Sequence, residues 1–206
     1  MGLPPGFRVR QELMDRQQLG RTLSRMAHEV AERDLDSGEP VIVGVRTRGV
    51  PLARRLAALI GAAVGTAPPV GALDITLYRD DLTTVGPQPV LKGTAIPVSI
   101  DGRMVLLVDD VLFTGRTIRA ALDELIDFGR PERIRLAVLV DRGHRELPIR
   151  ADHVGRTITT DREEVVQVML EEEDGEDRVV LLERLPARPA RARARREKRP
   201  ARRRRA

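Results

Sequence analysis

Residues 104–117, with the sequence MVLLVDDVLFTGRT, constrain the fold more than any other stretch of this chain. The apolar run at its start predicts a strand that is buried on both faces, which is typical of a parallel sheet covered by helices. Two adjacent acids, Asp109 and Asp110, end this strand, and a helix running to about Phe128 follows. Because an unpaired carboxylate in a core is costly, the two acids must meet a cation, hydroxyl groups or water there.

The rest of the chain alternates helix-like and strand-like segments. Apolar residues at spacings of three and four within residues 10–36 predict an amphipathic helix, and a second helix is expected over 50–60, ending near Gly61. The predicted strands are 41–45, 70–77, 104–109, 134–141, 165–170 and 179–185, the last two flanking an acidic turn. This alternation predicts an α/β fold with a mostly parallel, doubly wound sheet and helices on both faces.

In such sheets the ligand binds beyond the carboxyl ends of the strands, so the residues that follow Val45, Asp109 and Val140 should converge on one site. The segment 114–117 offers hydroxyl groups and backbone N–H groups at a helix start, which suits a phosphate dianion. An acidic pair beside a phosphate cradle predicts a sugar phosphate site. The alternative is a plain strand-to-helix turn in which Thr114 only caps the helix.

Residues 104–116 resemble the signature of type I phosphoribosyltransferases, which bind phosphoribosyl pyrophosphate (PRPP). Four further segments resemble the PyrR family, whose members regulate pyrimidine-biosynthesis operons through RNA and act as uracil phosphoribosyltransferases: RMAHE at 25–29, VRTRG at 45–49, DITLYRDDL at 74–82 and DRGHRELPIRAD at 141–152. The resemblance implies a type I phosphoribosyltransferase fold over residues 1–185, with a small hood at about 74–99. The implied reaction is uracil + PRPP giving UMP + pyrophosphate.

The resemblance also implies roles for individual residues. Asp109 and Asp110 would be catalytic, holding the ribose hydroxyls and stabilising the positive charge that develops at the anomeric carbon. Asp141 and Arg142 would lie near the uracil. The residues expected to bind PRPP or the nucleotide are Thr47, Arg48, Gly49, Arg79, Val111, Leu112, Phe113, Thr114, Gly115, Arg116 and Thr117. Mg²⁺ would arrive with PRPP, and we expect neither direct protein ligands for a metal nor an organic cofactor.

An RNA-binding face is the second implication of the resemblance, with an mRNA leader hairpin as the partner and UMP or UTP as the co-regulator. Few aromatic residues, one Tyr and three Phe, argue against a base-stacking platform. The alternative for the first helix is an ordinary salt-bridged surface, because Glu29 and Glu32 lie among its basic residues. The residues expected to bind RNA are Arg21, Ser24, Arg25, His28, Arg33, Arg145, Arg150 and Arg156.

Charge is distributed very unevenly along the chain. The whole sequence carries a net charge of +5, but residues 186–206 contain ten Arg, one Lys and one Glu, so the remaining residues are mildly acidic. This tail has too little apolar content to pack, and we expect a disordered cationic arm that contacts nucleic acid without sequence preference, or a solvated tail with no specific role. Only local patches on the body can therefore support specific RNA binding.

Cysteine is absent, which excludes disulfides, a thiol nucleophile and a thiolate metal site. No apolar run approaches the roughly 18 residues of a membrane span, and the N-terminus does not resemble a signal peptide, so we expect a cytoplasmic protein with no membrane partner. Following the resemblance, we also expect a homodimer or a higher homo-oligomer.

Two hypotheses of different classes remain at this stage. The first is a dual protein, an RNA-binding regulator that keeps uracil phosphoribosyltransferase activity. The second is a protein with only one of these roles: either an RNA-regulatory module with little enzyme activity, or a uracil salvage enzyme without specific RNA regulation whose basic tail binds nucleic acid non-specifically.

Overall fold

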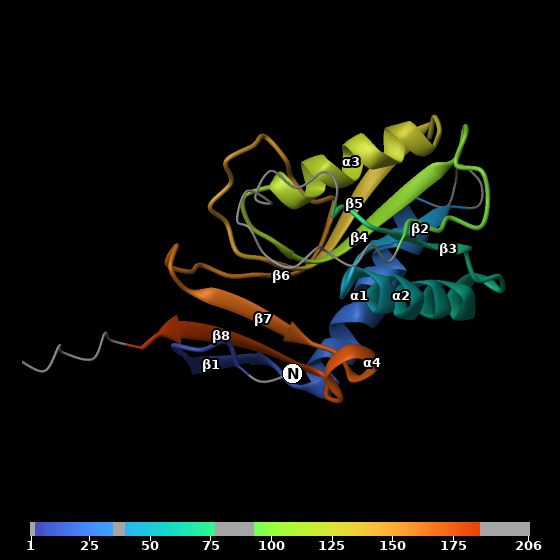
Figure 1. The fold of residues 1–206 in the computed structure, drawn as a ribbon. Helices are drawn as coiled ribbons and strands as arrows, with labels where there is room; N and C mark the ends of the chain where they lie inside the picture. The colour runs from blue at the N-terminus through green and yellow to red at the C-terminus, as the bar shows by residue number, and fades with distance from the viewer. Residues whose placement is uncertain (1–2, 35–39, 77–92, 186–206) are drawn as a thin grey trace, which may run out of the picture.

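The computed structural model describes residues 3–34, 40–76 and 93–185 (Figure 1). Its main sheet has five parallel strands in the order β3-β2-β4-β5-β6. The bounds of these strands are β2 Val41–Val45, β3 Val70–Leu73, β4 Met104–Leu112, β5 Arg133–Asp141 and β6 His153–Thr157. The predicted doubly wound parallel sheet is therefore confirmed.

Helices cover both faces of this sheet. Helices α1 (Arg16–Asp34) and α2 (Gly49–Val64) lie on one face, and α3 (Arg116–Phe128) lies on the other (Figure 1). Strand β4 supplies residues to both cores, because successive side chains point to opposite faces. Leu106 and Val108 pack in the cluster with α1 and α2, whereas Val105 and Leu107 pack in the cluster with α3. This burial on both sides explains the unbroken apolar run in the sequence.

A second, antiparallel sheet joins the two ends of the described chain, in the order β1-β8-β7. It consists of β1 (Phe7–Met14), β7 (Val165–Met169) and β8 (Arg178–Arg184), with the short helix α4 (Glu171–Asp174) between the last two. Leu13, Val168 and Val179 of this sheet belong to the same core as α1 and α2. The small sheet is thus packed against the α1–α2 side of the molecule.

Two strands and several boundaries differ from the prediction. The expected helix over 10–36 begins only at Arg16, because the residues before it form β1 and pair with β8. Strand β6 was not predicted, since its five residues include a glycine, a histidine and an arginine; pairing with β5 holds it in the sheet. Helix α2 continues past Gly61 to Val64 and ends at Gly65, whose left-handed φ of 90° glycine adopts without strain. Strand β3 is shorter than predicted.

The chain segments that lead into and out of the predicted hood are hydrogen-bonded to each other. Ala72 at the end of β3 forms an antiparallel bridge with Ala95, with backbone N···O distances of 2.9 and 2.8 Å. Most of the segment expected to form the hood lies outside the described residues, and so does the arginine-rich tail at 186–206. Within the described parts of the chain, no helix has the length and apolar character needed to cross a membrane.

Candidate functional site

The loops that follow β2, β4 and β5 lie at one edge of the main sheet, because these three strands are parallel neighbours. The contact between the first two loops is especially close. A Cβ atom added to Gly49 would fall 2.4 Å from the carbonyl oxygen of Val108 and 3.4 Å from the Cα of Asp109. The start of α2 therefore touches the end of β4 at the acidic pair, and only glycine leaves room for this approach.

Asp109 and Asp110 form the acidic centre of this edge. Asp109 is buried, with 6% of its surface exposed, and its Oδ1 accepts a hydrogen bond from the Asp110 N–H at 2.9 Å. Oδ1 of Asp110 accepts from the Val111 N–H at 2.9 Å. Burial raises the pKa of Asp110, because removing a carboxylate from water disfavours its charged form, and the nearby Arg48 guanidinium counteracts this only in part. A positive charge brought by a ligand would favour the charged form of Asp110 and would in turn be stabilised by the pair.

The loop from Thr114 to Thr117 leads into α3. Gly115 is the N-cap residue of this helix, has a left-handed φ of 93°, and provides no side-chain cap. The Thr114 hydroxyl accepts a long hydrogen bond, 3.4 Å, from the Arg116 N–H. The Arg116 side chain turns outward to Glu146, with 2.9 Å between Nε and Oε2. An anion at this helix start would therefore meet backbone N–H groups and the positive end of the helix dipole.

Arg48 and Asp174 make an ion pair that the sequence analysis did not predict. The Arg48 guanidinium donates to Asp174 Oδ1 at 2.8 Å and to Oδ2 at 3.1 Å, and the Asp174 side chain is only 1% exposed. Asp174 belongs to α4, in the segment expected to be an acidic turn. The pair ties the loop after β2 to the small sheet, and no local spacing could reveal it, because 126 positions separate its members.

The Arg48–Asp174 pair leads to a prediction about acid stability. Burial opposes ionisation of Asp174, but hydrogen bonds from Arg48 and from the Leu170 N–H outweigh it and hold its pKa below the usual 3.8. A carboxyl whose folded pKa is lowered adds stability above its unfolded pKa and loses it as pH falls through the folded pKa. We expect Asp174→Asn to lower Tm at pH 7 and to reduce the further loss of Tm below about pH 4.

Thermal unfolding across this pH range measures the effect. Glu176→Gln is the matched control, because Glu176 is an exposed acid of the same segment and should leave the profile unchanged. Equal acid slopes for the parent protein and Asp174→Asn would show that this pair does not contribute to acid stability.

Of the two residues expected near the base, Asp141 is the last residue of β5 and Arg142 begins the loop after it. Arg142 is 5% exposed, donates to Thr160 Oγ1 at 3.2 Å, and places its guanidinium carbon 4.1 Å from the centre of the Phe113 ring. Burial lowers the pKa of Arg142. Oδ1 of Asp141 accepts from the Gly143 N–H at 2.9 Å. The loop therefore carries its own internal bonds and meets the β4 loop through Phe113, a contact that the sequence analysis missed.

Most of the residues expected to bind RNA lie on α1. Arg33 and Arg25 both pair with Glu29, at 2.7 and 3.5 Å, and Arg25 also donates to the carbonyls of Val154 at 3.0 Å and Gly155 at 2.6 Å. His28 is exposed, and its Nδ1 lies 2.7 Å from the Ser24 carbonyl oxygen. The salt-bridged surface weighed above is thus present, and it is attached to strand β6.

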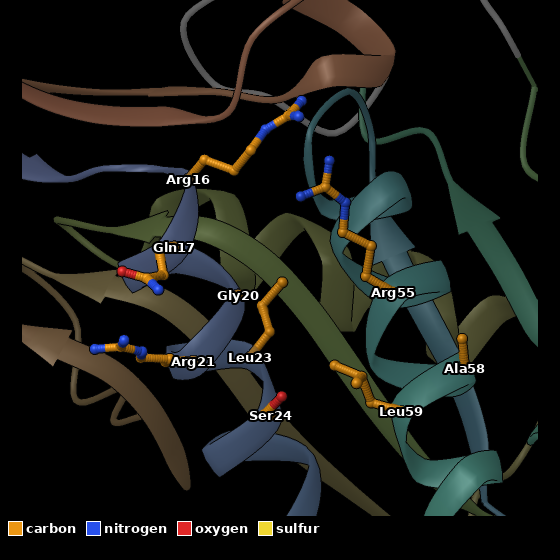
Figure 2. A pocket seen from close by; sticks show the side chains of 9 residues that line it. All are labelled: Arg16, Gln17, Gly20, Arg21, Leu23, Ser24, Arg55, Ala58 and Leu59. Carbon is orange, nitrogen blue, oxygen red and sulfur yellow. The ribbon is translucent and has the colours of Figure 1, made fainter.

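Arg21 and Ser24 line a groove of about 660 Å³ between α1 and α2 (Figure 2). Leu23 of α1 and Leu59 of α2 face each other across it, and the exposed Arg21 extends from its α1 side. The groove has cationic residues at its margins and an apolar floor.

Three other residues expected to bind RNA follow β5. Arg150 is exposed, and Arg156 of β6 donates to the carbonyl of Leu13 at the end of β1. Arg145 is half-buried, and its guanidinium bonds to Asp141 and to the carbonyl of Phe113. The structure therefore brings Arg156 to the β1 and β6 side near α1, whereas Arg145 is tied into the loop beside the acidic pair.

Two further expectations concern the pyrophosphate contact of Arg79 and the binding of a metal ion. Arg79, expected to contact pyrophosphate, lies outside the described residues. Among residues 3–34, 40–76 and 93–185, no group of three or more His, Asp or Glu side chains is arranged to hold a metal ion.

Comparison with known proteins identifies a clear set of relatives. The family model for the phosphoribosyl transferase domain matches residues 10–173. The bifunctional protein PyrR of Pelotomaculum thermopropionicum is 57% identical over 85% of this chain and 97% of its own length. The bifunctional protein PyrR of Thermus thermophilus is 58% identical over 86% of this chain and 98% of its own length.

Solved structures show the same fold at much lower identity. The hypoxanthine phosphoribosyltransferase of Trypanosoma cruzi has a TM-score of 0.66 and 20% identity, and covers 88% of this chain and 95% of its own. A hypoxanthine-guanine phosphoribosyltransferase from Bacillus anthracis has a TM-score of 0.61 and 19% identity, with 84% of this chain and 98% of its own covered.

Proposed function

Because this chain belongs to the PyrR family and has a phosphoribosyltransferase domain, we propose that it converts uracil and PRPP into UMP and pyrophosphate, and that it regulates pyrimidine-biosynthesis genes by binding their leader RNA. The observation that carries the enzymatic part is the buried acidic pair at the end of β4, directly before the helix start at Gly115. Ribose 5-phosphate carries hydroxyl groups at one end and a phosphate at the other. A carboxylate pair that lies a few residues before an anion site can therefore bind both ends.

The reaction exchanges one bond at the anomeric carbon of PRPP. The C1–oxygen bond to pyrophosphate breaks, the bond from C1 to N1 of uracil forms, and the proton of N1 is lost. Positive charge develops on the ribose between these events. Asp109 and Asp110 hold the ribose hydroxyls and stabilise that charge, and the low exposure of the buried Asp109 and the half-buried Asp110 strengthens the interaction.

The 5′-phosphate and the pyrophosphate of PRPP go to two different helix starts. The backbone N–H groups at Gly115–Thr117 hold the 5′-phosphate, and Thr47, Arg48 and Gly49 before α2 hold the pyrophosphate. Mg²⁺ would arrive with PRPP and would supply charge neutralisation for the pyrophosphate, and the carboxylates of Asp109 and Asp110 would face the hydrated ion without ligating it directly.

The base lies beside the loop after β5. Asp141 and Arg142 form this wall, where the contact between Arg142 and Phe113 keeps the loop against the β4 loop. Uracil is recognised here mainly by main-chain groups, because the Arg142 side chain is turned toward Thr160 and the Asp161 carbonyl.

The regulatory role uses the exposed basic residues of α1 with Arg150 and Arg156. Their side chains position RNA phosphates, and unpaired bases of a leader hairpin supply the sequence information. UMP or UTP in the nucleotide site changes RNA affinity by linkage. The protein works as a homodimer or a higher oligomer, is cytoplasmic, and its arginine-rich tail adds salt-dependent, sequence-independent attraction.

One paired assay tests both roles. UMP formation and binding to a pyrimidine-operon leader RNA, with scrambled RNA as control, are measured for the full chain and for a chain truncated after Leu185. We expect equal UMP formation, and a preference for the leader RNA that UMP strengthens in both chains. Loss of the preference with the tail would leave a uracil salvage enzyme with a non-specific arm, and absence of UMP formation would contradict the enzymatic proposal.

A further inference from the structure

His153 is a buried titratable residue that takes no part in the proposed chemistry. It begins β6, two strands from the acidic pair and in register with Ala137 of β5 and Val108 of β4, and its side chain is 2% exposed. Its Nε2 lies 2.6 Å from Oδ2 of Asp34, the last residue of α1, whose side chain is 3% exposed. Strand β6 and helix α1 are therefore joined by a short, water-excluded contact.

The other ring nitrogen of His153 faces a second carboxylate. Nδ1 is buried and has no hydrogen-bond partner among the described residues, and Oε1 of Glu29 lies 3.7 Å from it. Glu29 is one turn before Asp34 on α1 and is the carboxylate shared by Arg25 and Arg33. An unsatisfied buried nitrogen is costly, and Glu29 can satisfy it only when the nitrogen carries a proton, because an ionised carboxylate only accepts hydrogen bonds.

Other contacts make α1 sensitive to this histidine. Arg25 donates to the carbonyls of Val154 and Gly155, the two residues after His153. Gly155 itself touches the helix, since a Cβ added there would lie 2.9 Å from Thr22 Cγ2. The charged groups that face His153 are Asp34 and Glu29 from α1, and Arg135 from β5, whose Nε is 3.3 Å from Asp34 Oδ1.

We propose that His153 is a positioning residue for the RNA-facing side of α1, and that its protonation releases Arg25 and Arg33 from Glu29. This inference rests on the proposed RNA function. Neutral His153 donates from Nε2 to Asp34 and presents a lone pair toward Glu29, which stays with the two arginines. When Nδ1 gains a proton, it donates to Glu29, and Arg33 loses part of its partner and becomes available to RNA phosphates. Arg25 is loosened from Glu29 but keeps its hydrogen bonds to the Val154 and Gly155 carbonyls. RNA affinity should therefore rise on acidification.

The test compares RNA affinity at pH 8 and pH 6 in a His28→Gln background, because His28 is an exposed titratable group on the same helix. We expect about a threefold gain in affinity at pH 6, the size expected for releasing weak exposed ion pairs. Adding His153→Gln or Glu29→Gln should remove this gain. Glu32→Gln, an exposed acid on the same helix, is the matched control and should keep it.

A second readout needs no RNA. The NMR signals of the Arg33 and Arg25 side chains should move between pH 8 and pH 6 in the His28→Gln protein and stay still when His153→Gln is added. If they move as expected but no variant prefers leader RNA, the positioning role stands and the RNA function fails. The proposal is overturned if the pH-dependent movement of the signals or the gain in RNA affinity persists in His153→Gln. It is also overturned if Glu29→Gln keeps the gain in affinity. The Glu29→Gln result decides the question even if His153→Gln does not fold.

Discussion

Asp109→Asn and Asp110→Asn should each lower kcat/KM for UMP formation by about 10²–10³-fold, the loss typical of removing one preorganised group that stabilises transition-state charge. The substitution keeps the size of the side chain and removes its negative charge. Asp109 is buried and Asp110 half-buried, so water cannot replace the missing charge effectively. Steady-state kinetics with uracil, PRPP and Mg²⁺ measure the effect.

The direction of the kcat and KM changes distinguishes the role of the pair. Loss concentrated in kcat indicates charge stabilisation in the transition state, whereas a rise in KM alone indicates ground-state binding of the ribose. Asp123→Asn is the matched control, because Asp123 is an exposed acid of α3 and should keep full activity. Folded Asp109→Asn and Asp110→Asn proteins with full activity would remove the acidic pair from the reacting centre.

Gly49→Ala should damage both stability and activity. The new Cβ would fall 2.4 Å from the Val108 carbonyl oxygen, closer than real Cβ atoms come, and both partners are backbone of buried elements. Overpacking of this kind costs about 2 kcal/mol of unfolding free energy, which lowers Tm by about 4–8 °C in a domain of this size. The shift moves the end of β4 and its acids, so we expect kcat/KM to fall by about 10²-fold.

Gly20→Ala is the control for this prediction. A Cβ at Gly20, an exposed position within α1, meets nothing within 4 Å. Alanine is a better helix former than glycine by about 1 kcal/mol, so Tm should rise slightly and UMP formation should be unchanged. Differential scanning calorimetry and kinetics on both variants check the pair. A stable, active Gly49→Ala protein would mean that the α2 start can move away from β4 without consequence.

Much of the fold could be predicted because its signals are local. The apolar run at 104–108 and the glycines and prolines between segments identify the main sheet, and the start and end of β2 and the end of α3 were predicted correctly. Strand β4 continues past the predicted end at Asp109 to Leu112, because pairing with β5 extends through the acidic pair. The missed strand β6 contains one aliphatic residue, and in β1 charged and polar residues interrupt the apolar ones, so neither segment has the continuous apolar run that identified the main strands.

The candidate site also has parts that the sequence could predict and parts that it could not. Asp109, Asp110 and the residues of the Thr114–Thr117 loop are close in sequence, so a strand that ends in acids and a glycine at a helix start were sufficient to place them together. The partners of the arginines could not be found in this manner. Arg48 meets Asp174, Arg25 meets the β6 carbonyls, and Arg142 lies over Phe113, contacts that join separate elements.

By itself the sequence determined which loops carry charge and hydroxyl groups at the carboxyl edge of a parallel sheet, since strand periodicity and helix starts depend on neighbouring residues. Only the tertiary structure decided which of these groups are free to meet a ligand and which are already paired. His153 shows the reason: 119 positions separate it from Asp34, and only the packing of α1 on β6 brings the two side chains to 2.6 Å and excludes water from them. Pairing over such separations depends on the whole fold.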